Sequence, residues 1–244
     1  MSRLGSWRAH GVALPEFLVA LACALAVFGA ALGACCALGR VLQIQDAAAA
    51  RRAEAMVGLG ALRDAIEWAG SQQTEGNSDT GPVSGFPRQT SVWPARLAFS
   101  ERQVIAGGAW KTGAASRDFV AVRGKASMGG VLQDCPATAG GRGVPPSATR
   151  LSVYAVRDGR LLCQSRVVDR EATVSLSEAT GLRLRYGVDL NRDGAVDRYL
   201  DAAQVDAVGA WDAVRSVEIT LDLAAAPRDH ARKMRRIVAL RARL

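Results

Sequence analysis

The sequence predicts an α+β protein in which one long N-terminal helix, partly transmembrane and partly amphipathic, packs on an antiparallel β-sheet. A run of 23 residues without a charge, from Phe17 to Gly39, is followed by apolar residues at helical spacing that continue to about Trp68. Beyond residue 97, short segments of alternating polarity recur between glycine-rich joins, a pattern typical of strands connected by turns.

The composition narrows the classes of function. The chain has 244 residues, of which 49% are hydrophobic, and a formal net charge of +8. This excludes a disordered chain and allows a full core. The only histidines are His10 and His230, which leaves little material for imidazole catalysis or a multi-histidine metal site. We therefore expect that the protein is not an enzyme.

The apolar run predicts one membrane span, because 23 helical residues suffice to cross about 30 Å of hydrocarbon. Arg3 and Arg8 precede the run, and the next cation is Arg40. A positive flank at the front of a span predicts an N-terminus in the cytoplasm and residues 40 onward on the opposite side of the membrane.

The remaining chain divides by composition. Residues 40–70 continue the helix as an amphipathic half, residues 71–96 are rich in Gly, Ser and Pro and predict a loop, and residues 97–244 predict a β-rich globular domain. The strands expected in that domain are 117–122, 149–156, 160–164, 181–188, 214–223 and 236–244.

An acidic residue, Glu16, stands at the start of the apolar run, five residues after Gly11. The segment from His10 to Leu21 resembles the type III signal of type IV prepilins. The resemblance implies that residues 1–11 are a leader peptide, that a prepilin peptidase cuts after Gly11, and that Val12 becomes the N-methylated first residue. Residues 12–39 are then the transmembrane half of the helix, and Glu16 would pair with the amino terminus of a neighbouring subunit, since charges in hydrocarbon require a partner.

Several short landmarks in the exported part, taken in order, resemble the PilW-type minor pilins. They are Arg63-Asp64, Ala69-Gly70, Asp134-Cys135, Leu161-Leu162-Cys163, the stretches 184–189 and 193–199, Trp211-Asp212 and the stretch 238–241. The resemblance implies a type IV pilin-like fold and a minor pilin that helps to initiate, or prime, type IV pilus assembly. It also implies a single-pass protein of the bacterial inner membrane whose C-terminal domain lies in the periplasm, and later a place in the pilus, at its tip.

The partners implied are the prepilin peptidase, other minor pilins, the major pilin and a tip adhesin. Two other functions stay open. A minor pseudopilin of a type II secretion system shares the leader, helix and sheet. A membrane-anchored periplasmic lipoprotein or receptor is the other, because Leu32-Gly33-Ala34-Cys35 is similar to a lipobox.

Cys135 and Cys163 are the only cysteines outside the apolar run. An oxidising periplasm favours pairing of two such thiols, so we expect a disulfide between them.

Oxygen-bearing side chains recur at alternate positions in the segment 189–197. Asp189, Asn191, Asp193 and Asp197 occupy the first, third, fifth and ninth positions of an EF-hand-like loop, with Gly194 at the sixth. The twelfth position is Leu200 and not an acid. The segment therefore predicts either a β-hairpin turn or a calcium site, with the hairpin favoured; no other cofactor is expected.

The C-terminal run from residue 228 is rich in arginine and could contact phosphates. It also alternates as a strand, which would place the arginines on a solvent face. Because no aromatic residues are interleaved for base stacking, we do not expect a nucleic-acid partner.

Overall fold

The computed structural model describes residues 14–70, 89–91, 97–100, 103–112, 115–125, 135, 149–167, 170–223 and 233–241. The chain divides into two compact units, Met1–Ala50 and Arg51–Leu244. The predicted leader lies outside the described residues, as does most of the predicted loop 71–96.

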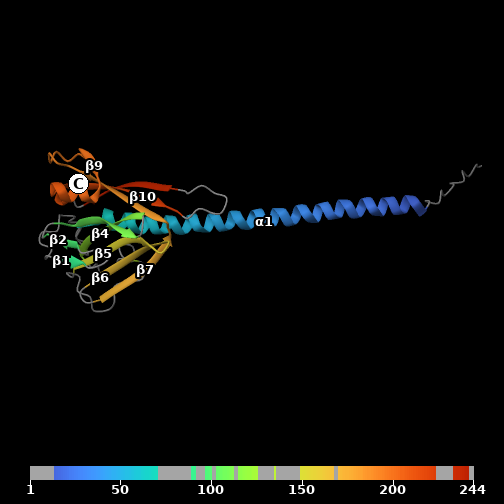
Figure 1. Ribbon diagram of the computed structural model, residues 1–244, viewed down its shortest axis with the longest axis horizontal. Coiled ribbons are helices and arrows are strands. Elements are labelled where there is room, and N and C mark those ends of the chain that lie inside the picture. The colour runs from blue at the N-terminus through green and yellow to red at the C-terminus, as the bar shows by residue number, and fades with distance from the viewer. Residues whose placement is uncertain are drawn as a thin grey trace, which may run out of the picture. The chain divides into compact units, whose positions relative to one another are not determined.

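The first element is one continuous helix, α1 (Leu14–Glu67), of 54 residues (Figure 1). It confirms the predicted long helix, and at 1.5 Å per residue it measures about 80 Å. In the first unit its apolar side chains are exposed, including Phe17, Phe28 and Leu38. Within the described part of the chain, this is the one helix long and apolar enough to cross a membrane, with a mean hydropathy of 2.4 in its most apolar window.

The second unit contains three antiparallel sheets in place of the single sheet that was expected (Figure 1). The five-stranded sheet has the order β3 (Ile105–Thr112), β4 (Ala115–Lys125), β5 (Thr149–Arg157), β6 (Arg160–Val167), β7 (Arg170–Glu178). The four-stranded sheet has the order β11 (Lys233–Ala239), β10 (Val214–Asp222), β8 (Gly181–Val188), β9 (Arg198–Leu200). A short ribbon pairs β1 (Gln89–Ser91) with β2 (Leu97–Phe99), and α2 (Ala202–Val208) and the 3₁₀ turn η1 (Trp211–Ala213) connect β9 to β10.

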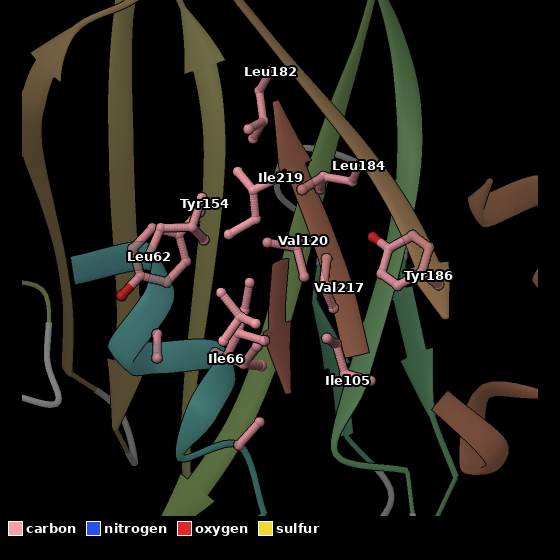
Figure 2. Packing of buried hydrophobic residues seen from close by; sticks show 14 of the residues in the cluster. Leu62, Ile66, Ile105, Val120, Tyr154, Leu182, Leu184, Tyr186, Val217 and Ile219 are labelled. Atoms are coloured by element: carbon pink, nitrogen blue, oxygen red, sulfur yellow. The ribbon is translucent and has the colours of Figure 1, made fainter. Parts of the chain in front are cut away.

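One hydrophobic core joins the end of α1 to both larger sheets. Leu59, Leu62 and Ile66 of the helix are buried in the same cluster as Tyr154 of β5 and Val217 of β10. Figure 2 shows that the helix, the five-stranded sheet and the four-stranded sheet all contribute side chains to this core. A smaller cluster on the other face of the five-stranded sheet includes Phe99 and Phe119. Because both faces of β4 and β5 are covered, residues 119–122 of β4 and 153–156 of β5 are consecutive buried hydrophobic residues rather than alternating ones.

The buried side chain of Arg123, in β4, contacts the segment that precedes β3. Arg123 is fully buried; its Nε donates to the carbonyl oxygen of Gln103 at 2.8 Å, and its guanidinium lies 4.8 Å from the ring centroid of Phe99. Burial lowers the pKa of Arg123 to about 10, so the side chain still carries its charge at neutral pH. The contacts with carbonyl oxygens compensate part of the cost of removing that charge from water.

One hydrogen bond also joins the two larger sheets directly, and another fixes the connection between them. The carboxylate of Asp118 in β4 accepts the backbone N–H of Leu184 in β8 at 2.7 Å. The N–H of Thr180, between β7 and β8, donates to the carbonyl oxygen of Asp222 in β10 at 2.8 Å. These contacts satisfy backbone groups that β8 and its neighbours would otherwise leave unpaired where the sheets meet.

Two of the strands that sequence patterns did not predict, β3 and β7, lie at the edges of the five-stranded sheet. β3 contains Gly107 and Gly108, residues that ordinarily weaken a strand. A Cβ at Gly107 would overlap the Tyr186 hydroxyl, and one at Gly108 would come within 2.7 Å of the Phe119 ring. The glycines are therefore required by close packing. The last strand was predicted at 236–244, but β11 spans Lys233–Ala239.

Two glycines of α1 allow a matched test of its packing. A Cβ at Gly58 would meet the Ser177 hydroxyl oxygen at 2.6 Å, whereas nothing lies within 4 Å of a Cβ at Gly60. Gly60→Ala should raise the free energy of unfolding by about 0.5 to 1 kcal/mol, the gain in helix propensity. Gly58→Ala should lower it, because the clash exceeds that gain. Chemical denaturation in detergent measures both; equal stabilisation by the two substitutions would show that α1 does not pack closely on β7.

Candidate functional site

The predicted processing site lies mostly outside the described residues. Gly11 and Val12 are not among them, and Glu16 is described only as part of the first turn of α1. Cleavage after Gly11, methylation of Val12 and charge pairing by Glu16 therefore stay predictions.

The structure joins Cys135 and Cys163 in a disulfide with a Cα–Cα distance of 5.6 Å. Cys163 lies on β6, and both cysteines are fully buried in the main core. A cross-link across 28 residues removes chain entropy from the unfolded state, for a stabilisation of about 3 to 4 kcal/mol. Among the described residues the cysteines without a disulfide are Cys23, Cys35 and Cys36, all exposed along α1.

The segment 189–197 connects β8 to β9, which pair as an antiparallel hairpin. Asp189 is the buried residue at its start. Its Oδ1 accepts the backbone N–H of Asp193 at 3.1 Å, and its Oδ2 accepts the N–H of Gly194 at 3.0 Å. Arg215 of β10 adds an ion pair, with one guanidinium nitrogen 2.9 Å from Oδ2. Burial opposes ionisation of Asp189, but the hydrogen bonds from Gly194 and Arg215 outweigh it and lower the pKa of the carboxyl.

The other three candidate ligands, Asn191, Asp193 and Asp197, make hydrogen bonds within the turn itself. Oδ2 of Asp197 accepts the N–H of Leu190 at 2.6 Å and that of Asn191 at 3.3 Å. Oδ1 of Asp193 accepts the N–H of Ala195 at 2.8 Å. The amide of Asn191 donates to Asp193 Oδ2 at 2.9 Å and accepts the backbone N–H of Asp193 at 3.0 Å.

These contacts favour the hairpin interpretation of the segment. No cluster of three or more His, Cys, Asp or Glu side chains that could hold a metal occurs within the described ranges. The guanidinium of Arg215 beside Asp189 would also repel a cation placed there. Gly194, at φ 91°, and Arg192, at φ 63°, give the backbone its left-handed turns. The carboxylates thus substitute for backbone acceptors in a tight loop.

A second cluster, which the sequence patterns did not reveal, joins the C-terminal end of the chain to the end of α1. Arg241 Nε donates to Glu67 Oε1 at 2.7 Å, and the Arg241 guanidinium lies 4.2 Å from the centroid of the Trp68 ring. The N–H of Leu240 donates to the carbonyl oxygen of Arg215 at 2.8 Å. Arg241 is therefore linked to the helix while 49% of its side chain stays exposed, in agreement with the solvent face that the alternating pattern predicted.

The helix α2 also escaped prediction, although it has a sequence signature. Asp201 accepts the N–H of Gln204 while the Gln204 side chain accepts the N–H of Asp201, which is a capping box. Gly209, at φ 64°, ends the helix. The sequence signal that could have predicted this helix is the Asp-x-x-Gln spacing of Asp201 and Gln204, followed by Gly209.

Comparison with known proteins adds family information for the C-terminal part of the chain. Residues 160–243 match the family described as Type IV Pilus-assembly protein W, PilW. The match covers β6 to β11, including the 189–197 hairpin, and roughly a third of the chain. No curated protein and no solved structure matches the chain.

The fold and the match together define a class. The chain is an α+β protein with an N-terminal apolar helix compatible with a single-pass membrane anchor, followed by antiparallel sheets. The PilW match supports involvement in type IV pilus assembly and, with it, interaction with other pilus components.

Asp189 should make the protein sensitive to acid. A carboxyl whose pKa is lowered by folding contributes stability above its unfolded pKa of about 3.9, and this is lost as the pH falls through the folded value. The free energy of unfolding should therefore decline below about pH 4. Asp189→Asn should be less stable at neutral pH and should show a shallower decline, while exposed Asp158→Asn serves as control. Denaturant titrations at several pH values measure this; identical pH slopes for wild type and Asp189→Asn would contradict it.

The hairpin interpretation predicts no response to calcium. Because the loop carboxylates already accept N–H groups and Arg215, melting curves in chelator and in calcium should coincide. Extracellular-type sites bind at about 10⁻⁴ to 10⁻³ M, so the titration has to exceed that range. A calcium-dependent rise in melting temperature that Asp193→Ala abolishes would instead establish the metal site.

Proposed function

We propose that this protein is a minor pilin that helps to initiate type IV pilus assembly together with other minor pilins. It is made as a single-pass precursor of the bacterial inner membrane with its C-terminal domain in the periplasm. Its role is architectural and not catalytic. Its partners are the prepilin peptidase, the other minor pilins, the major pilin and a tip adhesin, and its final place is the pilus, at the tip.

The observation that carries this proposal is the PilW match over β6 to β11 in a chain whose N-terminal helix is long and apolar enough to span a membrane. Exposed apolar side chains from Phe17 to Leu38 need either lipid or neighbouring helices. A pilus subunit meets both environments: lipid before assembly, and the helices of its neighbours afterwards.

Assembly in register needs a polar contact as well as apolar packing. In the proposed mechanism the peptidase cuts after Gly11, and the methylated Val12 ammonium becomes the first charge of the mature chain. Glu16 of one subunit then neutralises Val12 of its neighbour. In a medium of low dielectric constant an unpaired charge is costly, so a subunit aligned to form the pair is favoured over one that is not.

A deletion strain complemented with variants tests the proposal. Wild type should restore surface pili, and its mature form should begin at N-methylated Val12. Gly11→Val should keep Met1 and restore no pili, because the leader is not released. Glu16→Gln should be processed but restore few pili, whereas Glu54→Gln, an acid-to-amide change on the same helix, should behave as wild type. Mass spectrometry of the N-terminus and electron microscopy of the cells measure these outcomes.

Other outcomes would replace the proposal. Normal pili in the deletion strain together with lost enzyme secretion would indicate a type II secretion pseudopilin. A mature chain beginning at an acylated Cys35 would indicate a lipoprotein.

A further inference from the structure

Three arginines lie side by side on the outer face of the five-stranded sheet, the face that carries the smaller cluster with Phe119. Arg117 of β4 stands two residues before Phe119, and Arg157 of β5 stands two residues after Ala155, the register partner of Phe119. Because every second residue of a strand points to the same face, both arginines share the face of Phe119. Arg160 of β6 is the register partner of Arg157. Arg117, Arg157 and Arg160 therefore form one row across three neighbouring strands, which we call the arginine row.

The arginine row is compact and largely open to solvent. Arg157 and Arg160 are exposed, and Arg117 is half-buried. Neighbouring strands lie about 4.8 Å apart, so the row measures about 10 Å from its first strand to its third. Across from Arg160 on the edge strand β7 is Glu178, whose carboxylate lies 3.9 Å from Arg51 of α1. The row therefore presents three guanidinium groups on a short stretch of surface.

Contacts within the fold do not neutralise this charge. Arg157 Nε lies 3.3 Å from Asp158 Oδ2, but the two side chains are 53% and 87% exposed, so water screens the pair. Arg160 donates to the Ser175 hydroxyl at 3.4 Å, and neither Arg160 nor Arg117 makes an ion pair within the described part of the chain. Like charges directly opposite one another on a sheet are destabilising. The row thus costs stability that the fold does not require.

Hydrogen-bond donors in and beside the row also lack acceptors. One terminal nitrogen of Arg117 donates to the carbonyl oxygen of Val156 at 3.4 Å, which is longer than a typical bond of this kind. Nε of Arg117 is buried without a hydrogen-bond partner among the described residues, as is Nε1 of Trp110, the register partner of Arg117 on β3. A buried donor without an acceptor lowers stability. An incoming oxygen acceptor would remove that cost and would also neutralise the row.

We propose that the arginine row binds an acidic peptide segment of a neighbouring pilus protein. Each planar guanidinium group can bind a carboxylate through two parallel N–H donors. Alternate side chains of an extended peptide are about 7 Å apart, so two or three carboxylates of one short segment reach the three arginines. The inference rests on the proposed function only for the identity of the partner.

The length of the row favours a peptide over a nucleic acid. The row ends at Trp110 of β3 and at Glu178 of β7, so it does not continue as the basic groove that a nucleic-acid backbone follows. The ring of Trp110 packs against the Phe119 cluster and does not stand free for base stacking.

Two double variants with the same loss of charge test this site in the full-length chain in detergent. The probe is a fluorescently labelled pentapeptide with Glu at its first, third and fifth positions and Ser between them. Arg157→Gln with Arg160→Gln neutralises most of the row, and Arg183→Gln with Arg185→Gln, at exposed positions of β8 in the other sheet, is the control. Fluorescence anisotropy should show equal binding by wild type and control within about twofold, and binding at least about tenfold weaker by the row variant.

Denaturant unfolding separates binding from a structural role. Because the arginines of the row oppose one another, the row variant should unfold at the same denaturant concentration as wild type or at a higher one. A lower midpoint would show that the row serves the fold and would overturn the proposal. The same holds for an equal loss of binding in the control variant, for a wild type that does not bind the probe, and for tighter binding of an oligonucleotide of equal charge.

The outcome for this site is distinct from the outcome for the proposed function. Probe binding by a chain that is dispensable for pili would contradict the proposed function alone. Absence of probe binding in a chain that pili require would contradict the inference alone.

Discussion

The burial of one face of α1 against the sheets is the contact on which the globular unit depends. Leu59, Leu62 and Ile66 are almost completely buried, and each contributes about 1.5 to 3 kcal/mol through removal of apolar surface from water. The same cluster includes side chains of β5, β6, β8 and β10. Without the helix, the two larger sheets would face water across a shared apolar surface. The fold of the globular unit is therefore completed by residues 55–66 of the helix that also carries the apolar run.

The sequence predicted the elements whose signals are local. The helix was recognisable from its uncharged run and three-to-four spacing, and β5, β8 and β10 from short apolar segments between turns. β3 was missed because Gly107 and Gly108 are dictated by Tyr186 and Phe119, which approach from other strands. Contacts such as Arg241 with Glu67 join residues 174 positions apart. No local pattern contains that information.

The 189–197 hairpin shows why a spacing motif is ambiguous. Oxygen side chains at alternate positions curve inward in a tight loop whether they surround a cation or the N–H groups of the loop itself. Here Arg215, which is 26 positions away and supplies a positive charge next to Asp189, favours the arrangement around the N–H groups. The processing site differs from the hairpin because no contact within this chain bears on it. Gly11, Val12 and Glu16 are predicted from a local sequence resemblance, and their proposed function depends on a peptidase and on neighbouring subunits.

The position of the disulfide has a consequence for how the protein matures. Cys135 and Cys163 have no exposed surface, and Cys163 lies in the core that the end of α1 shares. An oxidising enzyme needs access to a thiolate, so it can act only while β6 is still uncovered. Oxidation therefore has to precede the final docking of helix and sheets, and a chain that closes its core first would trap two reduced thiols. The two cysteines in this way constrain the order of oxidation and folding.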